Sequence, residues 1–402
     1  MRNFSLAAVR PGLLAVMVAA VLAGCGQQAS DGHAAHSRAA ASCKDATSSS
    51  GVAVSGPAGT AAGLAASGTT RDLRLQVCGE DVHYPVVPRR AVTNDMGITE
   101  MYLFLGLEHR LAGFTGIRSH GEIDPAFQPS LKRVPDLSSQ GLTLENLLGV
   151  QADFVFAGWN YGFREGGVTP AILQRYGISS YALTESCVRI QPRQGVAIDD
   201  TLRDLRNIAR IFDVEAQTEA RIRAIETDLH DLRQRMQGVA ERPRVFLYDG
   251  GEKIPTTVGR YGMARAIIDL AGGENLFDDI ASNWPRGNWE DVVARDPAWI
   301  LINDYGTVSA QAKIDFLRQK PELANVDAIR NQRFFVISYA EATPGPRNVK
   351  AARALAQKLH PERFGAAATA ATAATAATAA TAATAATAAT AATAATAATA
   401  RS

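Results

Sequence analysis

Two stretches of this chain are near copies of each other. The sequence LENLLGVQADFVFAG begins at Leu144 and WEDVVARDPAWILIN begins at Trp289, an offset of 289 − 144 = 145 residues. In each copy an acidic residue stands second, apolar residues follow at helical spacing, and a run of strand formers comes last, which predicts a helix, a turn and a buried strand. Because the offset is too long for a solenoid repeat, the pair predicts two similar α/β lobes in one chain, with a cleft between them.

The beginning of the chain has the pattern of a secretory signal. A basic start is followed by an apolar run from Leu13 to Ala23, too short for a comfortable membrane span, and then by Leu-Ala-Gly-Cys ending at Cys25. This string resembles a bacterial lipoprotein signal, in which Cys25 receives lipid; the alternative is an ordinary signal peptide with a chance cysteine. We therefore expect residues 1–24 to be removed and the protein to be exported and lipid-anchored to the bacterial cell membrane, on its periplasmic or outer face.

Low-complexity sequence flanks the part of the chain that is expected to fold. Residues 25–70 are mostly Ala, Ser, Gly and Thr and cannot bury enough apolar surface to offset the entropy of ordering, so we interpret them as a lipidated flexible tether. Residues 366–402 repeat Ala-Ala-Thr, a period that turns Thr to every face of a helix, and we assign this tail no function. Residues 71–365 remain, enough for two lobes with cores of their own.

Charge and cysteine content narrow the partners and the compartment. The 41 basic side chains are nearly balanced by 40 acidic ones, so nucleic acid is not an expected partner. An exported protein meets an oxidising compartment. Of the cysteines besides Cys25, Cys43 lies in the tether, which favours a disulfide between Cys78 and Cys187, although sequence alone does not fix the pairing.

Periodicity divides the folding part into two lobes and a helical connection. The N-terminal lobe, 71–198, begins with a hairpin over 73–87 and then alternates strands at 91–93, 110–115, 154–156 and 178–183 with helices at 97–107 and 170–176. This alternation predicts a parallel sheet flanked by helices. Residues 199–242 predict two amphipathic helices, the second long enough to act as a stiff strut. The C-terminal lobe, 243–365, has strands at 244–248, 299–302 and 334–337 and helices at 262–270 and 346–360.

Five stretches together resemble a known family: residues 87–116, 142–158, 248–277, 289–304 and 344–364. In this order they are similar to the substrate-binding proteins of ABC importers for iron–siderophore complexes, haem and cobalamin, the helical-backbone or class III periplasmic binding proteins. The resemblance implies two Rossmann-like α/β lobes with parallel sheets, joined by a long rigid backbone helix, and a ligand cleft between the lobes. It also implies a monomer, without enzymatic activity or cofactor, that delivers its ligand to an ABC permease dimer with its ATPase. Ala152-Asp153 departs from the Pro-Asp common at this place in the family.

The resemblance also gives a role to the acidic residue of each twin segment. In the family, one surface glutamate on each lobe docks onto arginines of the permease, and the matching positions here are Glu145 and Glu290. Two quasi-symmetric carboxylates suit a two-fold permease, because a carboxylate pairs bidentately with arginine. The alternative is that each glutamate merely stabilises the N-terminus of its helix through the helix dipole.

Loops that follow the predicted parallel strands are the expected ligand site, since open parallel sheets bind ligands beyond the carboxyl ends of their strands. Aromatic side chains in these loops, mixed with arginine, suit a large, flat or anionic ligand. The leading candidates are Trp159, Tyr161, Tyr261, Trp284 and Arg286. Asn94, Arg118, Arg164 and Tyr248 complete the predicted set, although the tryptophans also suit lobe packing, the arginines surface pairing, and Tyr248 burial beside its strand.

The predicted cargo is a metal that arrives already chelated. Of the histidines in 71–365, His120 alone falls near a rim loop, so a direct transition-metal site is not expected. Plentiful arginine in the rim loops favours an iron–siderophore complex, followed by cobalamin, haem or a deazaflavin precursor. Two other classes remain as alternatives: a surface hydrolase, for which no G-x-S-x-G, H-E-x-x-H or P-loop string is present, and a tethered adhesion module, which needs no formed cleft.

Overall fold

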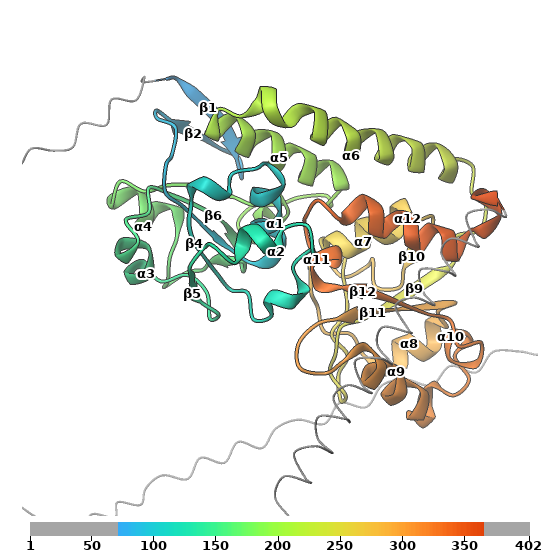
Figure 1. Cartoon of the computed structure of the whole chain (residues 1–402). Coiled ribbons are helices and arrows are strands. Elements are labelled where there is room, and N and C mark those ends of the chain that lie inside the picture. The colour runs from blue at the N-terminus through green and yellow to red at the C-terminus, as the bar shows by residue number, and fades with distance from the viewer. Residues whose placement is uncertain (1–70, 366–402) are drawn as a thin grey trace, which may run out of the picture. The chain divides into compact units, whose positions relative to one another are not determined.

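The computed structural model describes residues 71–365, which form two α/β lobes bridged along one side by two helices (Figure 1). The predicted signal 1–24, the lipid site at Cys25, the tether 25–70 and the tail 366–402 lie outside the described residues. Within 71–365, no helix combines the length and the apolar character that crossing a bilayer requires.

A parallel sheet forms the centre of the N-terminal lobe. Its strands lie in the order β5-β4-β3-β6-β8, with a short β7 on the end of β6; they are β3 (Ala91–Asn94), β4 (Leu111–Thr115), β5 (Asp136–Ser138), β6 (Phe154–Trp159), β7 (Gly162–Phe163) and β8 (Ser179–Ala182). The α-helices of this lobe are α1 (Met96–Phe104), α2 (Gln128–Leu131), α3 (Leu144–Gly149) and α4 (Pro170–Arg175). Every strand pair of the sheet is parallel, which confirms the prediction from the βαβ pattern.

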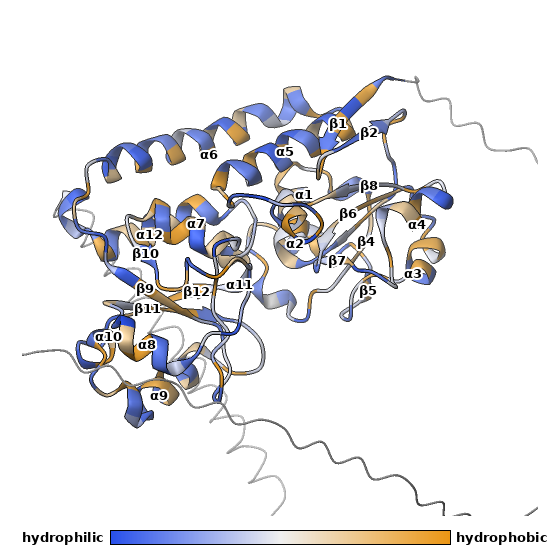
Figure 2. Cartoon of the chain, turned by 180° about the vertical axis from the view of Figure 1, so that it is seen from behind, coloured by the Kyte–Doolittle hydropathy of each residue, from blue (hydrophilic) through white to orange (hydrophobic). Residues whose placement is uncertain are grey.

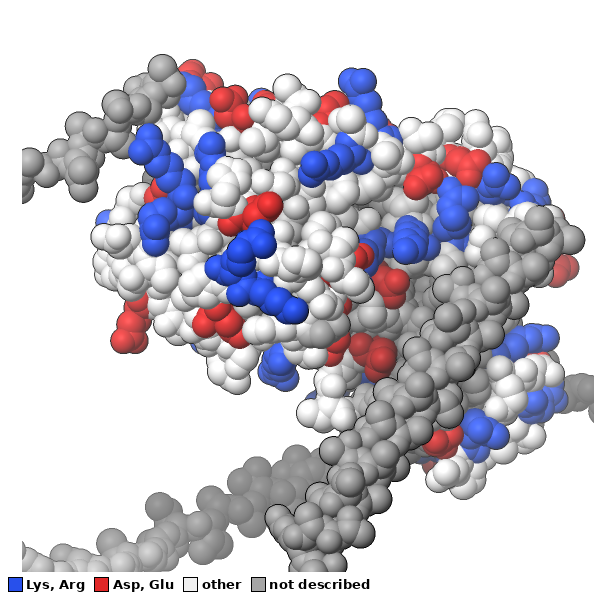
Figure 3. Space-filling view, in the orientation of Figure 1, with Lys and Arg blue, Asp and Glu red and all other residues white. Residues whose placement is uncertain are grey.

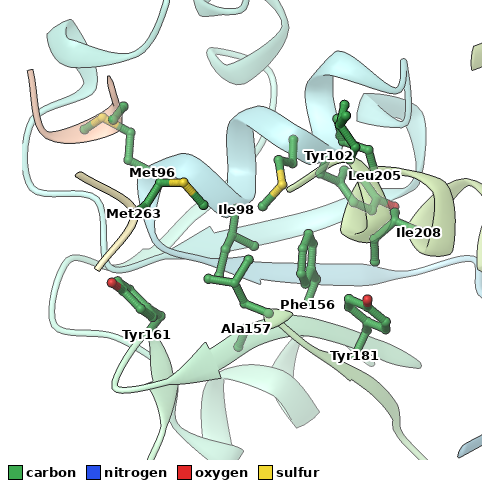
Figure 4. Packing of buried hydrophobic residues seen from close by; sticks show 14 of the residues in the cluster. Met96, Ile98, Tyr102, Phe156, Ala157, Tyr161, Tyr181, Leu205, Ile208 and Met263 are labelled. Carbon is green, nitrogen blue, oxygen red and sulfur yellow. The ribbon is translucent and has the colours of Figure 1, made fainter. Parts of the chain in front are cut away.

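Helices cover both faces of this sheet, and its central strand β6 is accordingly a nearly continuous apolar run. The first four residues of β6 are all 0 % exposed. Phe156 of β6 and Tyr181 of β8 point toward one face, where Tyr102 of α1 and Ile208 of the later helix α5 (Ile198–Phe212) pack (Figure 4). The sheet is thereby held between helices on each side, and its carboxyl edge is left to form loops.

A two-stranded antiparallel hairpin precedes the sheet. It consists of β1 (Leu73–Val77) and β2 (Glu80–Tyr84). A disulfide between Cys78 and Cys187, with Cα atoms 5.1 Å apart, attaches the turn of the hairpin to the segment that follows β8. The Tyr84 hydroxyl also donates to the carbonyl oxygen of Ser180 at 2.8 Å. The predicted cysteine pairing is therefore confirmed.

The helices α5 and α6 (Glu215–Met236) run along one side of both lobes (Figure 2). Asp213 ends α5 in the left-handed region, at φ 57°, and so allows a tight turn into α6. The 22 residues of α6 give it a length of about 33 Å. Its buried residues include Ile222, Leu229 and Leu232, whereas the rest of the helix is largely hydrophilic. A long connecting helix is confirmed.

The C-terminal lobe contains a smaller parallel sheet. Its strands lie in the order β10-β9-β11-β12 and are β9 (Arg244–Tyr248), β10 (Glu274–Asn275), β11 (Trp299–Asp304) and β12 (Phe334–Ser338). On one side lie α7 (Met263–Leu270) and α12 (Asn348–Leu359), and on the other α8 (Trp289–Arg295), α9 (Ala310–Gln319) and α10 (Asp327–Arg330) (Figure 1). The short α11 (Tyr339–Ala342) follows β12 directly. The twin segments form α3 with β6 in one lobe and α8 with β11 in the other, as predicted.

The two lobes do not have fully separate apolar cores, in contrast to the expectation from the sequence. One cluster of buried residues continues from the N-terminal sheet through α5 to α7 and α12 of the C-terminal lobe. A second cluster, which includes Phe246, Trp289 and Leu317, fills the other side of the C-terminal sheet. The first cluster is continuous because the connecting helix buries its apolar stripe against elements of both lobes. Since packed interiors deform little, a shared core favours small lobe motions over a loose hinge.

Candidate ligand-binding site

The loops at the carboxyl edges of the two sheets face each other. Tyr339, which follows β12, donates its hydroxyl to Asp95 Oδ2, which follows β3, at 2.6 Å. Trp284 Nε1 lies 3.4 Å from the hydroxyl of Tyr161, which follows β6. We call this region the seam and define it by Asp95, Tyr161 and Glu185 of the N-terminal lobe and Met263, Trp284, Tyr305 and Tyr339 of the C-terminal lobe. The predicted location of the ligand site, at facing strand ends, is where the two lobes meet.

Asp95 is held at the seam by its place at the start of α1. It is the N-cap of that helix, with φ 83°, and its side chain accepts a hydrogen bond from the Gly97 amide at 3.1 Å. Tyr339, its partner from the other lobe, stacks on Tyr305 with ring centroids 4.4 Å apart. Burial raises the pKa of Asp95 to about 6, although the Tyr339 hydroxyl and the backbone amides act in the opposite direction.

Glu185 is the second carboxylate of the N-terminal lobe at the seam. It lies in a 3₁₀ helix (Thr184–Arg189) directly after β8, and it is 1 % exposed. Its Oε1 accepts a hydrogen bond from the Met263 amide, at the N-terminus of α7, at 3.2 Å. Its Oε2 is buried and has no hydrogen-bond partner among the described residues, a condition that costs about 1–3 kcal/mol. Burial raises the pKa of Glu185 to about 8 against the lowering effect of the Met263 amide.

A buried ion pair also joins the two lobes through α1, the helix that Asp95 caps. Glu100 of α1 is 0 % exposed and pairs with Arg347, between α11 and α12, at 2.8 Å. A Cβ atom placed on Gly97 would lie 2.3 Å from the Pro344 carbonyl oxygen, so glycine is required for this close approach of the two lobes. Figure 4 shows Met96, Met263 and Tyr161 gathered at the same end of the core. The lobes are therefore in contact in this structure, with side chains spanning the seam.

Charged groups of the C-terminal lobe lie beside the seam. Asn303 Nδ2 donates to Asp249 Oδ1 at 2.7 Å, next to the ends of β9 and β11. Lys313 Nζ is already occupied, because it donates to the carbonyl oxygens of Asn303 and Tyr305 at 2.6 and 2.9 Å. Burial raises the pKa of Tyr305, and the positive charge of Arg118 opposes this effect, which places Arg118 near the seam.

The structure brings part of the predicted residue set together. Tyr161 and Trp284, predicted independently on the two lobes, meet at the seam, and Arg118 lies near Tyr305. Asn94 is at the same edge, where its Oδ1 accepts the Thr115 hydroxyl at 2.8 Å.

The remaining predicted residues have different surroundings. Trp159 lines a cavity of about 720 Å³ between β2 and the β8–α4 region. Tyr248 is 3 % exposed and stacks on Phe316 in the second core cluster, so the alternative of burial is the one observed. Tyr261 packs partly against the main core. Arg164 and Arg286 are exposed and make no side-chain ion pair within the described residues.

The seam contains aromatic side chains, as the sequence predicted, together with two buried carboxyl groups that the sequence did not single out. Glu185 and Asp95 both fall in loops that the strand-end rule nominates, but residue type alone gave aromatic and arginine side chains priority over them. Their tertiary contacts distinguish them, because each forms a hydrogen bond with a residue of the other lobe. On the face shown in Figure 3, basic and acidic side chains are interspersed, in keeping with the balanced charge of the chain.

Glu145 and Glu290 occupy equivalent places on the two lobes. Each is the second residue of its helix, α3 or α8, behind a side-chain N-cap from Thr143 or Asn288. Both are exposed, and neither makes an ion pair with another described residue. The helices α3 and α8 both lie away from α6 in Figures 1 and 2. The two carboxylates are thus free to meet a partner.

No group of three or more His, Cys, Asp and Glu side chains within residues 71–365 is arranged to hold a metal ion. His120, the histidine nearest a rim loop, instead contacts Asp136, with Nε2 and Oδ2 at 2.9 Å. The described part of the chain therefore offers no candidate for a direct metal site.

Two parallel α/β sheets, whose strand ends face each other across a seam and whose lobes share a long connecting helix, define a two-lobed ligand-binding protein. A family model described as periplasmic binding protein matches residues 92–340. The chain belongs to this family of extracytoplasmic binding proteins, whose members hold small ligands for ABC importers.

Individual relatives agree with this assignment. The chain is 25 % identical over 275 residues to a vitamin B12-binding protein of Pectobacterium carotovorum subsp. carotovorum (strain PC1), covering 68 % of this chain and 89 % of that protein. A periplasmic binding protein from Veillonella parvula DSM 2008 has a TM-score of 0.64 at 26 % identity, covering 73 % of this chain and 99 % of that one. An ABC-type Fe3+-hydroxamate transport protein of Saccharomonospora viridis DSM 43017, with a TM-score of 0.60 at 21 % identity and coverage of 73 % and 99 %, shares the fold.

Proposed function

We propose that this protein is the lipid-anchored substrate-binding component of an ABC importer and that it carries a preformed metal chelate in the seam. The observation that supports this most is the meeting of the two sets of strand-end loops at Asp95–Tyr339 and Tyr161–Trp284. Anchoring would occur through Cys25. The domain boundaries proposed with it are a lobe over 71–198, a helical connection over 199–242 and a second lobe over 243–365.

Two kinds of chelate are candidates for the cargo. The sequence favours an iron–siderophore complex because of its arginines, and the Saccharomonospora viridis neighbour is described as an Fe3+-hydroxamate transport protein. The curated relatives are named vitamin B12-binding proteins, which favours a corrinoid. Both are large, carry their metal already coordinated, and therefore need no metal-ligating side chains from the protein.

Binding is expected to change the fluorescence of Trp284 and to raise the melting temperature. Trp284 contacts Tyr161 across the seam, so a ligand between the lobes alters its surroundings. At a ligand concentration of 100 Kd, stabilisation amounts to about 2.7 kcal/mol. The measurement is a titration of the purified protein with cyanocobalamin, a ferric trihydroxamate, a ferric tris-catecholate and haem. Trp284→Phe is the control for the fluorescence signal. If none of the four compounds shifts either quantity, the proposed cargo class is wrong.

Reversing the charge of the two exposed glutamates is expected to separate binding from transport. The double variant Glu145→Arg, Glu290→Arg should bind ligand like the wild type, because both residues lie on helices outside the seam, and should lose at least about 90 % of uptake, since like charges meet at the permease. Uptake of labelled ligand by cells that carry the variant in place of the native protein measures this. Glu241→Arg, an exposed glutamate between α6 and β9, is the matched control. Undiminished uptake by the double variant would exclude these two residues from docking.

A further inference from the structure

We infer that Asp95 and Glu185 make the seam selective for metal chelates that carry no net negative charge. This inference rests on the proposed function, because it concerns the ligand that the seam holds. It narrows the candidate ligands to corrinoids and to uncharged or cationic siderophore complexes. Polyanionic siderophore complexes are excluded.

Both carboxyl groups face the place where the lobes meet. Asp95 Oδ2 contacts Tyr339 and Glu185 Oε1 contacts the Met263 amide, so each oxygen is held by a donor of the other lobe. When the lobes part to admit a ligand, these donors separate from the carboxyl groups, and the ligand takes their place. Whatever enters is thus adjacent to two acidic groups from the N-terminal lobe.

One oxygen of Glu185 indicates that the seam lacks a hydrogen-bond donor in this structure. Glu185 Oε2 is buried without a hydrogen-bond partner within the described residues, although buried polar atoms are normally paired. This atom lies on a side chain that already reaches between the lobes. The Tyr161 hydroxyl lies near enough to lower the pKa of Glu185 but makes no hydrogen bond to Oε2, so a ligand group can supply the missing donor.

The surrounding charges do not neutralise the two carboxyl groups. Asp95 is faced by Tyr339 of α11, by Tyr161 of the turn after β6, and by Tyr305, whose pKa its negative charge raises. Glu185 is faced by Asp95, by Tyr161 and by the Met263 amide of α7, and Arg189 of its own helix lowers its pKa.

Two nearby basic residues already bind other groups and so cannot pair with Asp95 or Glu185. Arg347 is bound to Glu100, and Lys313 to two carbonyl oxygens. Two basic residues remain: Arg118, near Tyr305 of the other lobe, and the exposed Arg189, which follows Glu185 in the same 3₁₀ helix. At the seam itself a polyanionic ligand would meet two buried carboxyl groups, and like charges in a partly desolvated site repel strongly.

The selectivity is expected to depend on pH. The pKa of Asp95 is raised to about 6 and that of Glu185 to about 8, burial being the main cause in both. As pH rises from 6 to 8, Asp95 passes from about half to almost fully ionised and Glu185 from almost fully protonated to about half ionised, so the seam becomes more negative by about one charge. Discrimination against an anionic ligand should accordingly be weak at pH 6 and strong at pH 8.

The test compares the affinities of three probes of different charge: net-neutral cyanocobalamin, a cationic ferric trihydroxamate and an anionic ferric tris-catecholate. For the wild type at pH 8, we expect the tris-catecholate to bind at least about tenfold more weakly than the better of the other two. This ratio should fall at pH 6, and at pH 8 it should fall in Glu185→Gln and in Asp95→Asn. The matched control, Glu241→Gln, should keep the ratio of the wild type.

Three results would count against the inference. One is a tris-catecholate that binds the wild type as tightly as the other probes at pH 8. Another is a ratio that stays unchanged both in Glu185→Gln and in Asp95→Asn when melting curves show the variants to be folded. In these two cases the proposed function stands and the selectivity is wrong. The third is no binding of any probe, which contradicts the proposed function and the inference with it.

Discussion

Replacing Cys78 and Cys187 together by serine is expected to lower the free energy of unfolding by about 4–5 kcal/mol. The disulfide joins residues 109 positions apart, and closing so long a loop restricts the unfolded chain strongly. For a domain of this size, 1 kcal/mol corresponds to a shift of about 2–4 °C, so the melting temperature should fall by roughly 10 °C or more. Chemical denaturation of the oxidised wild type and of the double variant measures the difference.

Reduction of the wild type supplies the control for this substitution. Reduced wild-type protein should unfold at nearly the same denaturant concentration as the serine variant, and the variant itself should not respond to reductant. The hairpin β1–β2 is the element that should loosen first, since its remaining side-chain link to β8 is the hydrogen bond from Tyr84 to Ser180. A loss below about 1 kcal/mol would show that the hairpin is held by its packing rather than by the disulfide.

The sequence was sufficient to predict most of the regular elements, because their signals are local. The twin segments predicted α3 with β6 and α8 with β11, and the amphipathic stretch predicted α5 and α6. In each case the apolar spacing and the helix-ending residues are contained within one short stretch. Most elements that escaped prediction are short, since α2 has four residues, β5 three and β10 two, but the ten-residue helix α9 was missed as well. The place of β5 and of β10 depends on pairing with one neighbouring strand, β4 or β9, rather than on their own pattern.

The sequence predicted where the strand-end loops of the two lobes meet, but not which side chains make contact there. The rule that ligands bind beyond the carboxyl ends of parallel strands nominated loops that the structure brings together where the two lobes meet. Within those loops, the side chain of Trp159 lines the cavity beside β2, whereas Tyr161, two residues later, meets Trp284 at the seam. Only the path of the backbone after β6 decides between them. The left-handed φ of Asp95 and the burial of Glu185 likewise depend on contacts with the other lobe, which no local pattern records.

The ion pair between Glu100 and Arg347 shows how strongly the two lobes depend on each other. Glu100 belongs to α1 of the N-terminal lobe and is 0 % exposed, while Arg347 precedes α12 of the C-terminal lobe. Replacing one member of a buried pair leaves the other charge without compensation, a change that costs about 3–5 kcal/mol. Arg347→Met, which keeps an unbranched side chain but removes the guanidinium, is therefore expected to destabilise the protein by about that amount at pH 8.

The pH dependence of this variant distinguishes a lost charge from lost packing. Burial raises the pKa of Glu100 to about 7 even though Arg347 lowers it, so the folded state holds this proton more tightly than the unfolded state does. Stability from such a group is complete at pH values below its ordinary pKa and is lost as pH rises through the folded value. Without Arg347 the pKa rises further, and the loss of stability extends to higher pH. Thermal melting of Arg347→Met at pH 5.5 and 8 should show the smaller deficit at pH 5.5, and Glu100→Gln in the same chain should restore most of the stability at pH 8. An equal deficit at both pH values, unrelieved by Glu100→Gln, would mean that the other contacts of the Arg347 guanidinium, such as its hydrogen bond to the Glu122 carbonyl oxygen, rather than its charge, join the lobes.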